Sequence, residues 1–137
     1  MVLISKSNKL KISGKDKTCY KIVRFVQRGY ITPEQESVII ESPKNKGIPY
    51  GTEFVAQGKV KVDIYGFEDY CFGNGLIHTY KWKDSAKQII RDCYGSDRNI
   101  ELYECIIPKG IEFIEGKSNN IKRSYASKKI IFIKRIT

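Results

Sequence analysis

The chain contains few of the side chains that usually carry enzyme chemistry. Its 137 residues include one histidine, His78, and four cysteines, none of them in a CxxC pair. A single histidine cannot complete a Cys/His zinc set, and neither a Walker A nor a G-x-S-x-G motif is present. We therefore expect no metal site and no Ser-His-Asp centre, and we interpret His78 as a structural residue of a strand.

Long apolar runs are missing as well. No segment reaches the roughly 18 apolar residues of a membrane span, and the start, MVLISKSNKLK, lacks the apolar core of a signal peptide. These absences predict a cytoplasmic protein without a membrane segment, in which the cysteines stay reduced. The length predicts a single domain over 1–137.

Acidic residues are scarce at both ends of the chain. Residues 1–24 hold seven basic residues against Asp16, and 117–137 hold seven and no acid, whereas 25–116 hold 11 basic and 14 acidic residues. The net charge of +10 therefore comes from the ends. Because domain termini usually lie at the surface and often close together, we expect one basic face that favours RNA, DNA or an acidic protein groove. The alternative is a lysine-rich proteome whose protein surfaces are basic in general.

Most of the remaining pattern is typical of strands. Apolar and β-branched runs predict strands at 19–26, 37–41, 75–82, 103–108 and 128–136. Residues 50–66 predict two further strands around a tight turn at Gln57-Gly58. The second of these is expected to be half-buried, because Val60, Val62 and Ile64 alternate with more polar residues.

One segment has the period of a helix. Its apolar face consists of Ala86, Ile89, Ile90 and Cys93. We expect Asp84 or Ser85 to cap this helix and Gly95 to end it, and we expect one further helical turn at 32–37. Strands, a helix and strands again predict an α+β domain with a curved, mostly antiparallel sheet and one main amphipathic helix at about 84–94.

Two segments are similar to parts of mono-ADP-ribosyltransferases: FGNGLIHTYKWKDSA and ECIIPKGIEFIEG. The resemblance implies an NAD-using transferase with His78, Tyr80 and Glu115 as candidate catalytic residues. That family often has its catalytic glutamate just before a later strand, where this chain has Tyr125-Ala126-Ser127 and no acid from 116 to 137. The fold can therefore be shared without the activity, and a transferase is the alternative function.

A second resemblance extends from Tyr20 to Lys134. The segments GYITP, YGTEF, GNGLIHTY, YECIIPKG and YASKKIIFIK, in this order, are similar to small accessory proteins carried by phages and mobile elements of bacteria. Such proteins often serve counter-defence, so the resemblance implies a non-catalytic, anti-CRISPR-like inhibitor in the cytoplasm of a bacterial host. Its partner would be RNA or a CRISPR-type ribonucleoprotein effector, bound without a cofactor.

The basic ends and the aromatic residues near them are candidate contacts for such a partner. Cationic side chains can follow a phosphate backbone, and exposed rings can stack on unpaired bases. The candidate contact residues are Lys9, Lys11, Lys15, Lys17, Arg24, Tyr80, Lys81, Trp82, Lys83, Lys122, Arg123, Tyr125, Lys128 and Lys129. For Tyr80 and Trp82 the alternative is a place at the edge of the core. A third functional hypothesis is a sponge that captures a charged nucleotide signal in a basic pocket.

Overall fold

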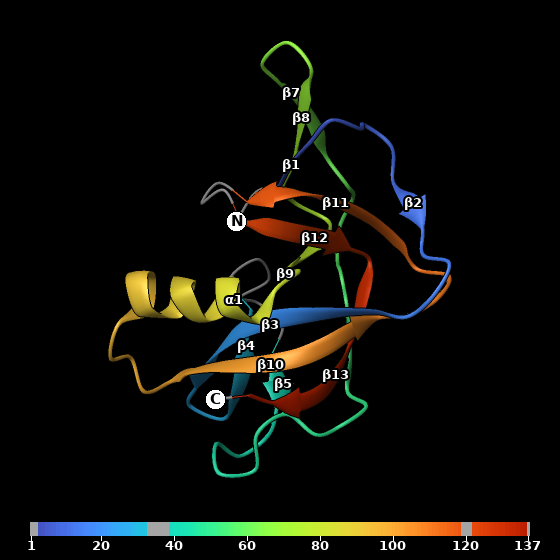
Figure 1. The fold of residues 1–137 in the computed structure, drawn as a ribbon. Coiled ribbons are helices and arrows are strands. Elements are labelled where there is room, and N and C mark those ends of the chain that lie inside the picture. Colours follow the sequence, from blue (N-terminus) through green and yellow to red (C-terminus); the bar gives the residue numbers. More distant parts are fainter. Residues whose placement is uncertain (1–2, 33–38, 119–121, 137) are drawn as a thin grey trace.

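Figure 1 shows the computed structural model, which describes residues 3–32, 39–118 and 122–136. The strands are β1 (Leu3–Ser5), β2 (Lys11–Ile12), β3 (Lys17–Val26), β4 (Gly29–Ile31), β5 (Ile40–Glu41), β6 (Glu53–Val55), β7 (Val62–Tyr65), β8 (Asp69–Phe72), β9 (Ile77–Tyr80), β10 (Ile100–Ile107), β11 (Glu112–Ser118), β12 (Arg123–Ser127) and β13 (Lys129–Arg135). One helix, α1 (Lys83–Ile89), continues directly into the π-helical segment Ile90–Tyr94.

The strands form one sheet in which every pairing between described strands is antiparallel. Its main path runs β6-β13-β10-β3-β9-β12-β11-β1-β8-β7, with β2 beside β11, and β4 and β5 continuing from β3. Within the described strands, β6 and β7 at the two ends of this path do not pair, so the sheet is not closed into a barrel. The prediction of a mostly antiparallel sheet with one helix is confirmed.

Four of the predicted strands are confirmed in place. They correspond to β3, β9, β10 and β13, and β10 begins at Ile100, earlier than expected. The strand predicted at 37–41 is limited to β5, and residues 37 and 38 lie outside the described part of the chain. The same holds for the helical turn expected at 32–37, of which the structure describes Thr32 alone.

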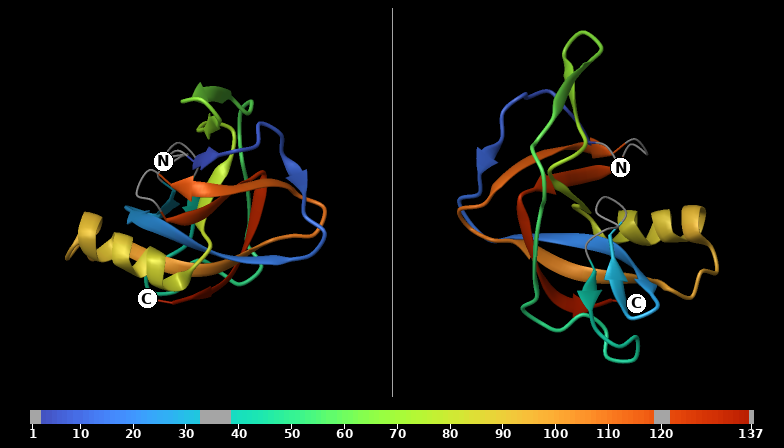
Figure 2. Two further views of the ribbon diagram at one scale, coloured as in Figure 1. Left: turned by 45° about the horizontal axis from the view of Figure 1, so that its top comes forward. Right: turned by 180° about the vertical axis from the view of Figure 1, so that it is seen from behind.

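The two strands predicted in 50–66 exist, but the expected turn does not bring them together. β6 pairs with β13 and β7 pairs with β8, so the chain crosses from one end of the sheet to the other between them. β7 is not half-buried either, since all four of its residues are exposed. The reason is visible in Figure 2, where the β7–β8 hairpin extends beyond the body of the molecule. An alternating pattern cannot report whether any core lies beneath it.

The helix follows the predicted span with two corrections. It begins after Trp82, which makes no side-chain cap, so neither Asp84 nor Ser85 has the capping role. Ala86 and Ile89 are buried as expected, whereas Cys93 is exposed. The last turn is π-helical, with the Gly95 amide donating to the Ile90 carbonyl. This wider turn carries an extra residue and rotates Cys93 away from the sheet.

Both faces of the central strands are buried. One face carries an apolar cluster that includes Val23, Tyr103 and Phe132. On the other face, Ile22 and Leu102 pack with α1. Figure 2 likewise places α1 beside β3 and β10. β9 lies between β3 and β12, and all four of its residues are buried.

A buried carboxylate organises the first of these faces. Glu101 has no exposed surface, and its carboxylate accepts hydrogen bonds from Tyr30 (2.8 Å) and Tyr103 (2.7 Å). Arg135 Nε lies 3.6 Å from the same carboxylate, and the Ile48 amide donates to the Tyr103 hydroxyl at 2.9 Å. A buried charge costs stability unless it is paired and hydrogen-bonded, and here it is both. We therefore regard this network as structural.

Candidate functional site

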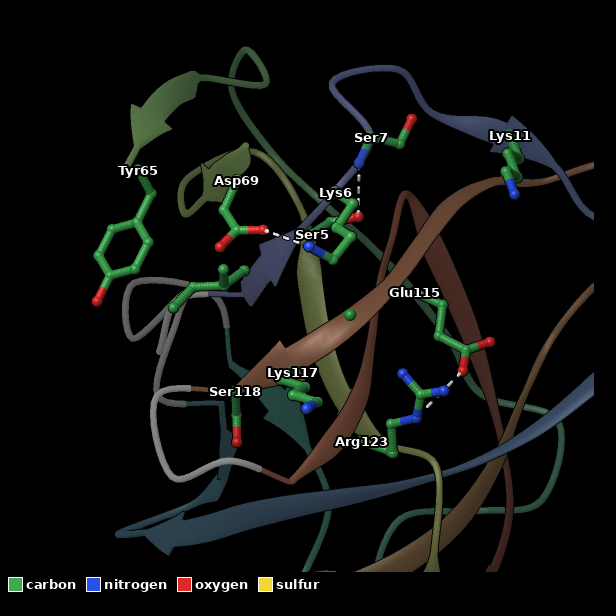
Figure 3. Close-up of a pocket in the computed structure, with 12 residues that line it drawn as sticks. Ser5, Lys6, Ser7, Lys11, Tyr65, Asp69, Glu115, Lys117, Ser118 and Arg123 are labelled. Carbon is green, nitrogen blue, oxygen red and sulfur yellow. Dashed lines mark hydrogen bonds and ion pairs between the residues drawn. The ribbon is translucent and has the colours of Figure 1, made fainter. Parts of the chain in front are cut away.

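A hollow of about 840 Å³ lies where β1, β11 and β12 meet the β7–β8 hairpin. Figure 3 shows its charged and hydroxyl-bearing lining. The lining contains four cationic and two acidic side chains: Lys6, Lys11, Lys117, Arg123, Asp69 and Glu115. Among the other residues that line it are Ser5, Ser7, Ser118 and Tyr65. The charged side chains of the lining therefore carry more positive than negative charge.

The sheet register explains why cations meet at this place. Lys117 of β11 lies directly opposite Arg123 of β12, and the Lys81 amide donates to the Arg123 carbonyl at 3.0 Å. Residues that face one another across antiparallel strands share a face of the sheet. Lys117, Arg123 and Lys81 therefore form a row across three neighbouring segments, with strands about 4.8 Å apart. We call these three residues the cationic row.

Glu115 partly neutralises the cationic row. Its Oε2 lies 3.1 Å from Lys81 Nζ and 3.9 Å from Arg123 Nε. Glu115 stands two residues before Lys117 on the same strand and opposite Tyr125, so it lies on the same face as the row. Like charges in opposed positions destabilise a sheet, and the carboxylate reduces that cost. The carboxylate contacts two of the three cations, Lys81 and Arg123, so the row keeps a net positive charge.

The other cations of the hollow differ in how they are compensated. Lys6 Nζ lies 3.7 Å from Asp69 and 3.9 Å from Glu68, all on exposed or half-exposed side chains. Neither Lys11 nor Lys117 has an ion-pair partner within the residues that the structure describes. These two ammonium groups are the strongest candidates for contact with an anion from solution.

Hydroxyl groups complete the lining. Ser5 Oγ accepts a hydrogen bond from the Ser7 amide at 3.2 Å, and Ser118 Oγ accepts one from the Lys122 amide at 3.3 Å. A serine hydroxyl that accepts from the backbone can still donate its own proton. Cations flanked by hydroxyl donors match the oxygen atoms of a phosphate group.

The predicted basic face is assembled only in part. β1 and β2 both pair with β11, and β11 pairs with β12, so the two basic ends of the chain meet at the hollow. Other cations from the predicted face lie away from the hollow or form ion pairs with acidic residues. Lys129 pairs with Glu53 at 2.6 Å, and Arg24 pairs with Asp97 at 3.1 Å. β13, which carries Lys129, is separated from β12 by β10, β3 and β9. The expectation of a single basic face is corrected to one basic region at the hollow.

Several other predicted cations remain on the surface. Lys9 and Lys15 are exposed on either side of β2, and Lys83 is exposed at the start of α1. Lys122 Nζ donates to the Gln88 side chain at 2.8 Å, Lys128 is half-buried, and Lys17 Nζ lies 5.1 Å from the Phe113 ring centre.

Of the three aromatic candidates, two are buried and one is exposed. Tyr80 and Tyr125 are each 5% exposed, so neither ring can stack on a base, and both belong to the core. Trp82 is 56% exposed, and Lys81 Nζ lies 5.2 Å from its ring centre. The ring of Trp82 is therefore accessible next to the cationic row.

The residues of the transferase hypothesis are not brought together. His78 and Tyr80 are on one face of β9, because they are two residues apart. Glu115 is on the opposite face, since it pairs with Tyr125 and Tyr125 pairs with Thr79. His78 is 1% exposed, and its Nε2 lies 2.9 Å from the Gly73 carbonyl. A sheet therefore separates the imidazole from the proposed carboxylate.

Sequence reasoning did not select Lys6, Lys117, Asp69 and Tyr65 as site residues, although all four line the hollow. A usable signal existed in the Glu115-Gly116-Lys117 segment, where two charged residues at a spacing of two share one strand face. Asp69 and Tyr65 had no such signal, because their place depends on the pairing of β8 with β1.

Two further observations concern the described residues. No three His, Cys, Asp or Glu side chains in them are grouped as metal ligands. None of their helices has the length and apolar character that crossing a membrane requires. Comparisons with protein families, with curated proteins and with solved structures gave no match, so the geometry above is the basis on which function is assigned.

Proposed function

We propose that this protein is a non-catalytic binding protein that takes an RNA strand at the hollow between the β7–β8 hairpin and β12. The observation that carries the proposal is the cationic row, in which Lys117, Arg123 and Lys81 face one side of the sheet. Glu115 contacts Lys81 and Arg123, and no ion pair of the described residues involves Lys117. Such an arrangement costs stability in the free protein, and a bound phosphate would offset that cost.

The surroundings of the row favour a strand of nucleic acid. Lys11 and Lys6 line the same hollow as Lys117 and Arg123 and add two further cations to it. The exposed ring of Trp82 lies beside Lys81, where it can stack on an unpaired base while the cations hold the backbone.

We place this binding in a phage-type, counter-defence setting. The protein would inhibit a bacterial defence ribonucleoprotein of the CRISPR type by occupying its guide RNA, in the cytoplasm of the host. This part of the proposal rests on the resemblance to accessory proteins of phages and mobile elements that the sequence suggested, and not on a match to a known protein. A curved sheet and an amphipathic helix that holds it from the far face belong to the same proposal, since both would keep the hollow concave.

The experiment is a binding titration of a short, labelled hairpin RNA at several salt concentrations. The test variant carries Lys11→Glu, Lys117→Glu and Arg123→Glu. The matched control carries Lys46→Glu, Arg98→Glu and Lys134→Glu, three exposed cations away from the hollow with the same change in net charge. We expect the test variant to lose about tenfold to a hundredfold in affinity and to lower the salt slope by about 2 to 3, because each lost phosphate contact removes about 1.

The control variant distinguishes a site from general attraction. Equal losses in both variants would show that net charge alone attracts RNA, and would contradict the proposal. No binding by the wild-type protein even at low salt would contradict it as well.

The volume of the hollow favours a second candidate, the capture of a small anionic nucleotide. About 840 Å³ falls within the range of small-molecule sites, roughly 300–1,000 Å³. A nucleotide sponge would show stoichiometric capture by calorimetry without turnover, and Lys117→Glu would abolish the heat of binding. RNA and nucleotide then compete for the same residues, and their relative affinities decide between the two functions.

A further inference from the structure

The strand β7 combines an open edge with exposed apolar side chains. It is the last strand of the sheet path and pairs with β8 alone among the described strands. Val62 is 37% exposed, Ile64 82% and Tyr65 54%, and Phe67 at the tip of the hairpin is fully exposed. Exposed apolar edge strands pair readily with another chain, and natural proteins usually protect them. Here the edge is left open.

The direction of the peptide groups shows which residues face that open edge. The Lys61 amide donates to the Asn74 carbonyl at 3.5 Å, which directs the peptide groups of residue 61 toward the β8 side. Peptide groups alternate in direction along a strand. The N–H and C=O groups of Val62 and Ile64 therefore point outward, where a further strand could bond to them.

Symmetry limits the ways in which two copies of this edge can pair. In an antiparallel pair around a two-fold axis, one residue must lie opposite its own copy. An axis at Asp63 would place two carboxylates opposite each other. An axis at Val62 instead places Lys61 opposite Asp63 of the second copy, twice, and Val60 opposite Ile64, twice, so that pairing extends β7 by the two residues that precede it. This register joins opposite charges on one face and apolar side chains on the other.

We propose that β7 is a self-association edge, through which two copies of this chain form an antiparallel dimer centred on Val62. Lys61 and Asp63 are both exposed in the single chain and supply the charge complementarity. The Val62 and Ile64 side chains of the two copies form one apolar strip on the sheet face that carries Phe72. Val60, which packs against the cluster that contains Phe72, lies at each end of this strip. The interface is small, so the Kd is expected in the micromolar range.

The first test is sedimentation of the full chain over a micromolar to near-millimolar concentration series. Wild-type protein is expected to show a monomer–dimer equilibrium. Lys61→Asp and Asp63→Lys should each weaken the dimer about tenfold or more, because both replace two attractive contacts with two repulsive ones. An equimolar mixture of the two variants should form a heterodimer, since each charge then meets its opposite.

The mixing experiment separates specific pairing from general electrostatics. Both variants keep a large net positive charge, so overall charge disfavours their association. Wild-type protein that stays monomeric throughout the series would overturn the proposal. A dimer that persists unchanged in both single variants would overturn it too, because that dimer uses another surface.

Cysteine cross-linking tests the register directly. In a background with Cys71→Ser and Cys93→Ser, Val62→Cys should give a disulfide-linked dimer on oxidation, because residue 62 lies opposite its own copy at about 5.5 Å. Ile64→Cys should not, since two residues 64 would lie roughly 14 Å apart in this register. Cross-linking of the Ile64→Cys variant in preference would show that the proposed register is wrong.

Discussion

Replacing Glu115 with glutamine should strengthen the binding of RNA. The carboxylate lies 3.1 Å from Lys81 and 3.9 Å from Arg123, so it competes with any phosphate for the same two cations. Glutamine keeps the shape of the side chain and removes its charge. The variant therefore isolates one electrostatic effect at the centre of the proposed site.

The magnitude follows from the geometry of the ion pairs. A phosphate held by Arg123 would lie roughly 6 Å from the Glu115 carboxylate, where the effective dielectric constant lies between about 20 near a protein surface and about 80 in bulk water. The repulsion removed is then about 0.7–2.8 kcal/mol, which corresponds to an affinity gain of about threefold to a hundredfold. The salt slope should become steeper by up to about 0.9, because the freed cations can neutralise one further phosphate, whose condensed counterion is then released from the RNA.

Fluorescence anisotropy with the labelled hairpin RNA measures both quantities, and thermal unfolding provides the control. Without ligand, the variant should lose about 0.5–1 kcal/mol of stability, since Lys81 and Arg123 lose their shared anion while Arg123 stays opposite Lys117. Unchanged or weaker RNA binding by a folded Glu115→Gln variant would refute the reasoning. Under the transferase hypothesis the same substitution would instead remove an NAD-dependent activity, so the two outcomes have opposite signs.

Three further predictions concern the core. Tyr103→Phe should lower the free energy of unfolding, measured in urea, by about 2 kcal/mol. The substitution removes a hydrogen bond to the buried Glu101 carboxylate and leaves the Ile48 amide without its acceptor. The control Tyr125→Phe should lower the free energy of unfolding clearly less. Burial raises the pKa of Tyr103 and Tyr125 to about 12, so the unfolded chain releases these protons first as the pH rises through about 10. The free energy of unfolding should therefore fall between pH 10 and 12, by up to about 1.4 kcal/mol per pH unit for each tyrosine. In thermal unfolding, the variant with both Tyr103→Phe and Tyr125→Phe should show a flatter dependence of stability on pH. Gly116→Ala should destabilise the protein by about 3 kcal/mol or more and weaken RNA binding. The added Cβ would overlap the Ile4 carbonyl and displace β1 from the hollow. A melting temperature equal to that of the wild type would contradict this prediction.

Local pattern was sufficient for the strands that form the centre of the sheet. β3, β10 and β13 are long runs of apolar and β-branched residues, and such runs are buried in most settings. The helix was equally clear up to Ile89, but a π-turn depends on packing and leaves no periodic signal, so the exposure of Cys93 was missed. Short strands such as β1 and β2 are specified by their partner β11 rather than by their own composition.

The candidate site shows the same limit more strongly. Charge counting indicated that both ends of the chain are basic, and the pairing of β1 with β11 brings them together as expected. It could not indicate that Lys129 pairs with Glu53 at the other end of the sheet, or that Tyr80 and Tyr125 are core residues. Those facts depend on register, because a shift of one residue moves every side chain of a strand to the other face.

The pairing of β1 with β11 also determines when the hollow can exist. Leu3 lies opposite Ser118, so the strands that line the site are more than a hundred residues apart in the chain. Contacts between residues so far apart in sequence form late in folding. During synthesis they cannot form until the C-terminal strands have been made. A nascent chain thus carries its early lysines next to ribosomal RNA without the cationic row. Under the proposed function, specific binding would require the completed sheet, and a chain that ends before β11 should bind RNA no better than its charge alone predicts.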